Sequence, residues 1–237
     1  MSPKLSLTKS FRPHILAAGC VILALTACSG VGGKTAQLYV LSPSTNVAAD
    51  TPSVNWQLAI AIPVAPANLD TTRIALNQSA IKTDYFASAE WTDRTPVVVQ
   101  NQLVKAFETS GKLKNVFRDS GALRADYVLD TEIRDFEAQY AQPNAAPNAV
   151  VRIESKLIKV ANNEIVGSFI AEKSVQASQN QIDSIVGAFN EALGAVLQQT
   201  VEWSLRTGPA APVKRVHHRH RAKPHAAPDA QPATPQQ

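Results

Sequence analysis

The chain has 237 residues, of which 45% are hydrophobic and 18% are charged, and it contains only two cysteines. Its formal net charge is +4, but residues 28–205 carry 14 Lys and Arg against 18 Asp and Glu, whereas residues 206–237 carry six Lys and Arg against Asp229 alone. A nucleic-acid-binding domain needs its basic patch on the folded part, so this distribution argues against nucleic acid as a partner.

The first 27 residues have the composition of a secretory signal peptide. Lys4, Lys9 and Arg12 precede an apolar, uncharged run over residues 15–25. This run is too short to span a bilayer, which needs about 20 apolar residues. It has the length of a signal-peptide core instead. We therefore expect residues 1–27 to be removed from the mature protein.

The end of this segment has the bacterial lipobox pattern. Leu25, Thr26 and Ala27 place a branched apolar residue and two small residues directly before Cys28. In proteins with this pattern the thiolate accepts a diacylglyceryl group, the chain is cut before the cysteine, and the new amino terminus is acylated. The alternative is an ordinary secretory signal followed by an incidental cysteine, but a lone thiol in an oxidising compartment is a liability. We expect Cys28 to be the lipid anchor and Cys20 to leave with the signal peptide.

The next segments are short strands that follow a Gly-rich tether over residues 28–36. Residues 37–41 and 56–62 are two apolar runs with strand character, and the second is apolar enough to be buried on both faces. Residues 73–76 and 81–86 are predicted to pair as a hairpin.

A helix is expected to follow the hairpin. Thr95 is a candidate capping residue, and Pro96 suits the first turn. The apolar face repeats every four residues through Val99, Leu103 and Phe107, and Gly111 ends the helix. A short strand over residues 115–118 comes next.

The second half of the chain predicts an antiparallel meander and a long closing helix. Residues 125–138, 151–157 and 165–175 alternate between apolar and polar side chains, which is typical of a sheet with one wet face. Asn162-Asn163 predicts a two-residue turn with positive φ. The closing helix carries one apolar stripe, formed by Ile182, Ile185, Val186, Phe189, Leu193, Leu197 and Val201.

These elements predict one α+β domain over residues 37–205, with a mostly antiparallel or mixed sheet and two main helices packed on one face. Residues 206–237 are rich in Pro, Ala, His and Arg and are predicted to form a disordered basic tail. The simplest interpretation of this tail is a solvated segment. Contact with anionic envelope polymers or lipid head groups is the functional alternative.

The folded part offers little catalytic chemistry. All five histidines lie in the signal peptide or the tail, and no cysteine follows Cys28, which removes Ser/His, Cys/His and His- or Cys-based metal sites from the domain. The pairs Asp130/Glu132 and Asp135/Glu137 are expected to lie on a solvated sheet face. His217, His218 and His220 could chelate a metal weakly, but neighbouring cations oppose it. We therefore expect no enzyme, no metal and no cofactor, only the covalent diacylglycerol and N-acyl lipid on Cys28.

An aromatic cluster is the remaining candidate site. Tyr85, Phe86 and Trp91 lie close together between short elements. Packing in the core is the simpler interpretation, and a contact surface for a partner or a lipid is the functional one.

Several stretches, taken in order, resemble the ABC-type transport auxiliary lipoprotein family. The matching stretches are Tyr39-Val40-Leu41-Ser42, residues 69–76, residues 84–91 with Asp93-Arg94, residues 123–129 with Arg134-Asp135-Phe136, and the closing helix through Ala188-Phe189 and Ala192-Leu193. Ser29 follows the lipobox cysteine, which resembles lipoproteins sorted to the outer membrane. The long His/Arg tail departs from the family pattern.

The resemblance implies a non-catalytic accessory component of an intermembrane lipid transport system. Such a protein would be anchored at the periplasmic face of the outer membrane of a Gram-negative bacterium. Its partners would be a mammalian-cell-entry-domain periplasmic protein and the associated permease and ATPase, and a homo-oligomer is left open. The alternative is a structural envelope lipoprotein that contacts the cell wall or anionic polymers through its basic tail.

Overall fold

The structure is a computed structural model that describes residues 35–79, 81–121 and 123–210. The predicted signal peptide, the lipobox with Cys28, most of the tether and residues 211–237 of the tail lie outside the described residues. The ten described elements follow the predicted order. They are β1 (Gln37–Tyr39), β2 (Gln57–Ile60), β3 (Arg73–Ser79), β4 (Lys82–Trp91), α2 (Thr95–Ser110), β5 (Asn115–Arg118), β6 (Tyr127–Gln139), β7 (Asn148–Lys159), β8 (Glu164–Gln176) and α3 (Ile182–Thr207).

Strand β6 organises a mixed sheet of eight strands. One edge of β6 pairs with β7 in antiparallel fashion along its whole length, and β8 pairs with β7. Two strands pair with the other edge of β6, both in parallel. Strand β2 pairs with the beginning of β6, where Leu58 lies opposite Tyr127. Strand β3 pairs with the end of β6, where Ala75 lies opposite Glu137. The sheet therefore branches. It continues through β5 at one end of β6 and through β4 and β1 at the other.

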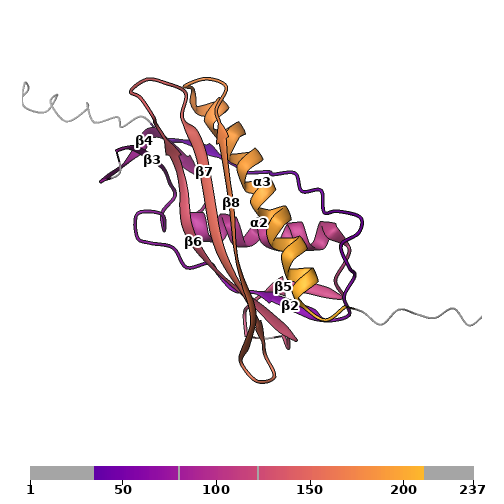
Figure 1. The fold of residues 1–237 in the computed structure, drawn as a ribbon. Helices are drawn as coiled ribbons and strands as arrows, with labels where there is room; N and C mark the ends of the chain where they lie inside the picture. Colours follow the sequence, from indigo (N-terminus) through magenta and orange to yellow (C-terminus); the bar gives the residue numbers. More distant parts are fainter. Residues whose placement is uncertain (1–34, 80, 122, 211–237) are drawn as a thin grey trace, which may run out of the picture.

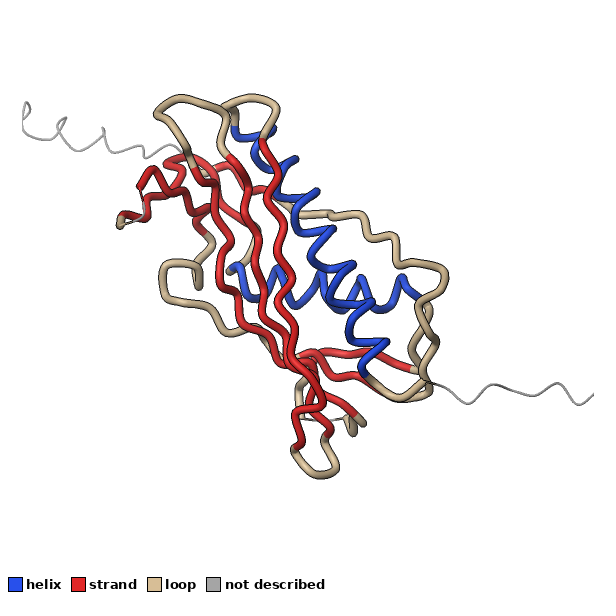
Figure 2. The backbone as a smooth tube through the Cα atoms, viewed as in Figure 1, coloured by secondary structure: helices blue, strands red, loops and turns tan. Residues whose placement is uncertain are grey.

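Both helices lie on the same side of this curled sheet (Figures 1 and 2). Helix α3 runs along β7 and β8, and α2 crosses it and contacts β5 and β2. This confirms the predicted α+β class with a mixed sheet. Neither helix in the described part of the chain combines the length and the apolar character needed to cross a bilayer.

The helices form where the apolar spacing predicted them. Val99, Leu103 and Phe107 of α2 are buried, and Gly111 ends the helix with a positive φ of 60°. The prediction that Thr95 caps α2 is wrong. Arg94 occupies the capping position without a side-chain hydrogen bond, and the Thr95 hydroxyl instead donates to the carbonyl of Thr71 at 3.3 Å.

Strand β6 departs from simple alternation at one point. The pairing with β7 shifts register between Ile133 and Asp135, so the buried positions change from odd to even numbers and Phe136 and Ala138 enter the core. Glu137, predicted on a solvated face, is only 6% exposed and accepts a hydrogen bond from the Gln139 side chain at 3.0 Å. The extra residue of a β-bulge has this effect, and alternation alone does not reveal it.

The turn between β7 and β8 is also longer than predicted. Four residues, 160–163, connect the strands, and only Asn163 has a positive φ, at 55°.

Candidate functional site

The predicted aromatic cluster does not form one surface. Trp91 is 2% exposed and packs edge-on against Phe136 and Phe189, with ring centroids 6.0 and 5.4 Å away. Trp91 therefore belongs to the core and is not accessible to a partner. Tyr85 is half-buried, with the Arg73 guanidinium 3.7 Å from its ring centroid. Phe86 is half-buried against the core, so a contact role stays a prediction only for Tyr85 and Phe86.

Three carboxylates of the outer sheet face, those of Glu132, Asp135 and Glu154, are paired with arginines. The Arg134 guanidinium lies 2.7 Å from the Glu132 carboxylate and 2.6 Å from the Glu154 carboxylate. Arg134 donates a hydrogen bond to Glu154, which lowers the pKa of the Glu154 carboxyl. Arg152 pairs with Asp135 in the same way. Groups of three or more His, Cys, Asp or Glu that could hold a metal do not occur among the described residues. These contacts are surface ion pairs, which solvent screens.

The most developed hollow lies at the end of the sheet where β6 begins. We call it the end groove. It has a volume of about 840 Å³, is open to solvent, and is lined by four parts of the chain: residues 55–57 with Ala59, Asp119 with residues 123–128, residues 159–161, and residues 209–210. Backbone hydrogen bonds hold these segments together. The Asp126 carbonyl accepts from the Val160 N–H at 3.0 Å, and the Asp126 carboxylate accepts from the Gln57 N–H at 2.8 Å.

The floor of the end groove is aromatic and its walls are apolar. Trp56 and Tyr127 pack with ring centroids 4.8 Å apart, and the Trp56 indole N–H donates to the Pro209 carbonyl at 3.1 Å. Gly208 permits this contact because a Cβ at that position would lie 2.5 Å from the Trp56 ring. Leu123 and Val160 form the walls with 61% and 42% of their surfaces exposed. Exposed apolar side chains around a hollow are typical of an interaction site.

The lining of the groove carries two basic and two acidic side chains. The carboxylates of Asp119 and Asp126 accept backbone hydrogen bonds, whereas Arg124 and Lys159 make no ion pair within the described part of the chain. Burial raises the pKa of the Tyr127 phenol, and the charges of Asp126 and Glu164 raise it further, so the floor stays neutral. The groove therefore combines apolar side chains with two cations that have no ion-pair partner among the described residues.

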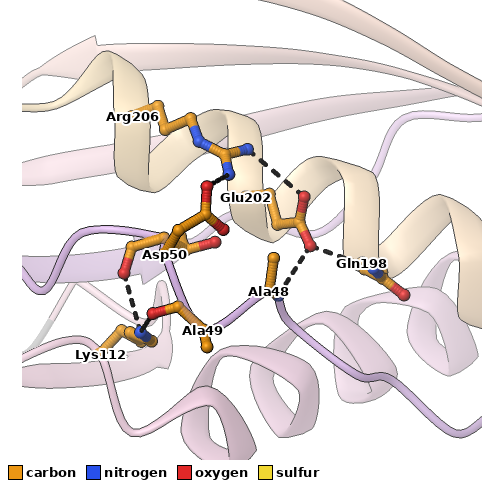
Figure 3. A network of polar contacts seen from close by, with 8 residues as sticks. Ala48, Ala49, Asp50, Lys112, Gln198, Glu202 and Arg206 are labelled. Carbon is orange, nitrogen blue, oxygen red and sulfur yellow. Dashed lines mark hydrogen bonds and ion pairs between the residues drawn. The ribbon is translucent and has the colours of Figure 1, made fainter.

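A polar network fixes the loop that leads into the groove (Figure 3). The Glu202 carboxylate of α3 accepts hydrogen bonds from the Ala48 N–H at 2.9 Å and from the Gln198 side chain at 3.0 Å. Lys112, just after α2, donates to the carbonyls of Ala49 and Thr51 at 3.0 and 2.8 Å. The loop before Trp56 is therefore tied to both helices.

Glu202→Gln should lower stability in a pH-dependent way. The hydrogen bond from Ala48 lowers the pKa of the Glu202 carboxyl most, although burial opposes the shift. Since the folded pKa lies below the unfolded value, the stabilisation is present above about pH 4.3 and is lost as the pH falls through the folded pKa. We expect a loss of about 1 kcal/mol at pH 7 and a smaller loss at pH 3. Urea unfolding at both pH values measures it.

The matched control is Glu191→Gln, an exposed glutamate on the same helix. It should change the free energy of unfolding by less than about 0.5 kcal/mol at either pH. Equal effects of the two substitutions would contradict the role of the Glu202 network.

The chain belongs to the family of ABC-type transport auxiliary lipoprotein components, whose family model matches residues 39–201. Among solved structures, protein XCC0632 from Xanthomonas campestris is 28% identical, with a TM-score of 0.68 over 73% of this chain and 96% of its own. A second structure, of an uncharacterized protein, is 14% identical with a TM-score of 0.55, over 73% and 99% of the two chains, and shows the fold alone. No curated protein matches the chain. The predicted family is thus confirmed.

The end groove was missed by sequence reasoning. Its walls come from four segments up to about 150 residues apart along the chain, and Leu123 and Val160 have the composition of ordinary buried positions. One local signal is present in the sequence: Gly208-Pro209, which directly follows the last helix, also forms the contact with Trp56.

Proposed function

We propose that the protein is a non-catalytic accessory component of an ABC-type intermembrane lipid transport system. Lipid on Cys28 would anchor it at the periplasmic face of the outer membrane. The observation that carries the proposal is the family match, which covers nearly the whole folded domain and follows a lipobox. The partners are a mammalian-cell-entry-domain periplasmic protein and, through it, the permease and ATPase.

We further propose that the end groove receives a segment of the periplasmic partner protein. A site for an extracted lipid would bury most of the ligand surface, whereas this groove is open to solvent. The free charges of Arg124 and Lys159 suit acidic side chains on the partner, because complementary charges steer association and exclude wrong partners. Leu123 and Val160 supply the apolar contacts.

Site-specific photocrosslinking in living cells tests this function. We expect a photoreactive residue at position 160 to give a crosslink to the mammalian-cell-entry-domain protein. The control position is Ile170, which is 56% exposed on β8 away from the groove and should give no such product. Reversal of both free charges, Arg124→Glu with Lys159→Glu, should reduce the crosslink about tenfold or more.

Two outcomes would contradict the proposal. Crosslinks at position 160 only to cell-wall material would favour the structural envelope lipoprotein. Equal crosslinking at positions 160 and 170 would remove the groove as the docking place.

A further inference from the structure

We propose that the β3–β4 hairpin end of the domain faces the membrane and that Ile81, at the hairpin tip, enters its head-group region. This inference rests on the proposed lipid anchor at Cys28. It adds an orientation: the hairpin end lies on the bilayer, and the end groove points away from it.

The first argument for this orientation is the direction from which the chain enters strand β1. Strand β1 pairs in parallel with β4, with Gln37 opposite Ala89 and Tyr39 opposite Trp91. In a parallel pair, the chain upstream of one strand lies beside the upstream part of the other. The chain that precedes Gln37 therefore approaches from the side on which β4 begins, which is the side of the hairpin tip. In Figure 1, the described chain starts at the hairpin end, and the β7–β8 turn lies at the opposite end.

The length of the tether is the second step. Eight residues lie between Cys28 and Gln37, and the nine steps from one residue to the next span at most about 32 Å when fully extended. The hairpin extends six residues beyond Arg73, from Arg73 to Ser79, or about 20 Å. The tether can therefore bring the lipid of Cys28 level with the hairpin tip.

The opposite orientation requires more chain. The register of the parallel β3–β6 pair, in which Ala75 lies opposite Glu137, places Arg73 level with Asp135. From Asp135 to Tyr127 at the groove is eight residues, and the β7–β8 turn extends farther still, so the distance exceeds about 26 Å. The tether would have to reverse its direction at β1 and run back almost fully extended along the domain.

The chemistry of the hairpin end is the third step. Ile81 is 97% exposed, the most exposed large hydrophobic side chain among the described residues, and Lys82 beside it is also exposed, in a surface ion pair with Asp84 at 3.0 Å. Leu38 on β1 and Val40 just after it are 61% and 62% exposed. They point away from the helices, because Tyr39 between them donates its hydroxyl to Asp183 of α3 at 2.8 Å. Exposed aliphatic side chains next to a lysine suit the boundary between anionic head groups and acyl chains.

Depth-dependent fluorescence quenching on vesicles tests the orientation. Cys20 is lost with the signal peptide and the Cys28 thiol carries lipid, so Ile81→Cys introduces the only free thiol of the mature lipoprotein. This thiol is labelled with an environment-sensitive fluorophore. The full-length lipidated protein is then reconstituted into phosphatidylethanolamine/phosphatidylglycerol vesicles that contain a lipid with a quencher just below the head groups. Val160→Cys, in the end groove, is the matched control.

We expect quenching at position 81 to be about twofold or more stronger than at position 160, because interfacial insertion reaches only about 5–10 Å into the bilayer. Equal quenching at the two positions, or stronger quenching at position 160, would overturn the proposed orientation. The lipid anchor is judged separately, because it is supported whenever the protein floats with the vesicles. Failure of both labelled proteins to float would instead overturn the lipid anchor, and the orientation with it. Circular dichroism of both variants checks that the fold is retained.

Discussion

Cys28→Ala should abolish lipid attachment and release the domain from the outer membrane. The thiolate is the only acceptor for the diacylglyceryl group in the lipobox pattern, and two or three acyl chains, at about 0.8 kcal/mol for each buried methylene, account for stable anchoring. Metabolic labelling with palmitate and membrane fractionation measure the two effects. We expect complete loss of label and loss of co-fractionation with the outer membrane.

Cys20→Ala is the control for this experiment. It removes the other cysteine from the apolar run of the signal peptide and should leave labelling and fractionation unchanged. Firm retention of Cys28→Ala at the outer membrane would overturn the anchor, and with it the localisation that the proposed function requires.

Trp91→Ala should strongly destabilise the fold. The Trp91 ring is 2% exposed and packs edge-on against Phe136 of β6 and Phe189 of α3, whose rings stack on each other 5.2 Å apart. Truncation would leave a cavity where the sheet meets the closing helix. The expected loss is about 3–5 kcal/mol in the free energy of unfolding, measured by urea denaturation.

Ile81→Ala is the matched control, because Ile81 lies on the same strand hairpin but is almost fully exposed. It should change the free energy of unfolding in solution by less than about 0.5 kcal/mol. Similar losses for the two variants would show that Trp91 does not hold the core together. A stable Trp91→Ala protein with reduced partner crosslinking would restore the contact role.

The sequence was most informative where one side-chain pattern extended over many residues. The apolar stripe of α3 and the alternation of β7 predicted both elements, because burial on one face imposes a period on a long segment. The lipobox is equally local, so Cys28 could be singled out without a structure. The core position of Trp91 agrees with the simpler of its two interpretations.

The sequence was least informative where distant segments meet. The branching of the sheet depends on which part of β6 each of β2 and β3 pairs with, and those short strands carry no pattern that fixes a partner. The bulge after Ile133 reverses the alternation and places Glu137 inside. Thr95 had the composition of a cap, but the approach of Thr71 gave its hydroxyl a different acceptor.

The sharing of β6 by the two branches has a mechanical consequence. The hairpin end and the end groove are joined through one continuous strand that is hydrogen-bonded to β7 along its full length. A pull between these two ends acts along the strand axis, while the hydrogen bonds lie perpendicular to it. The covalent backbone of β6 therefore carries such a pull directly, and the hydrogen bonds to β7 are not opened one at a time, as in unzipping. We expect tension between the two ends to leave the pairing of β6 with β7 intact.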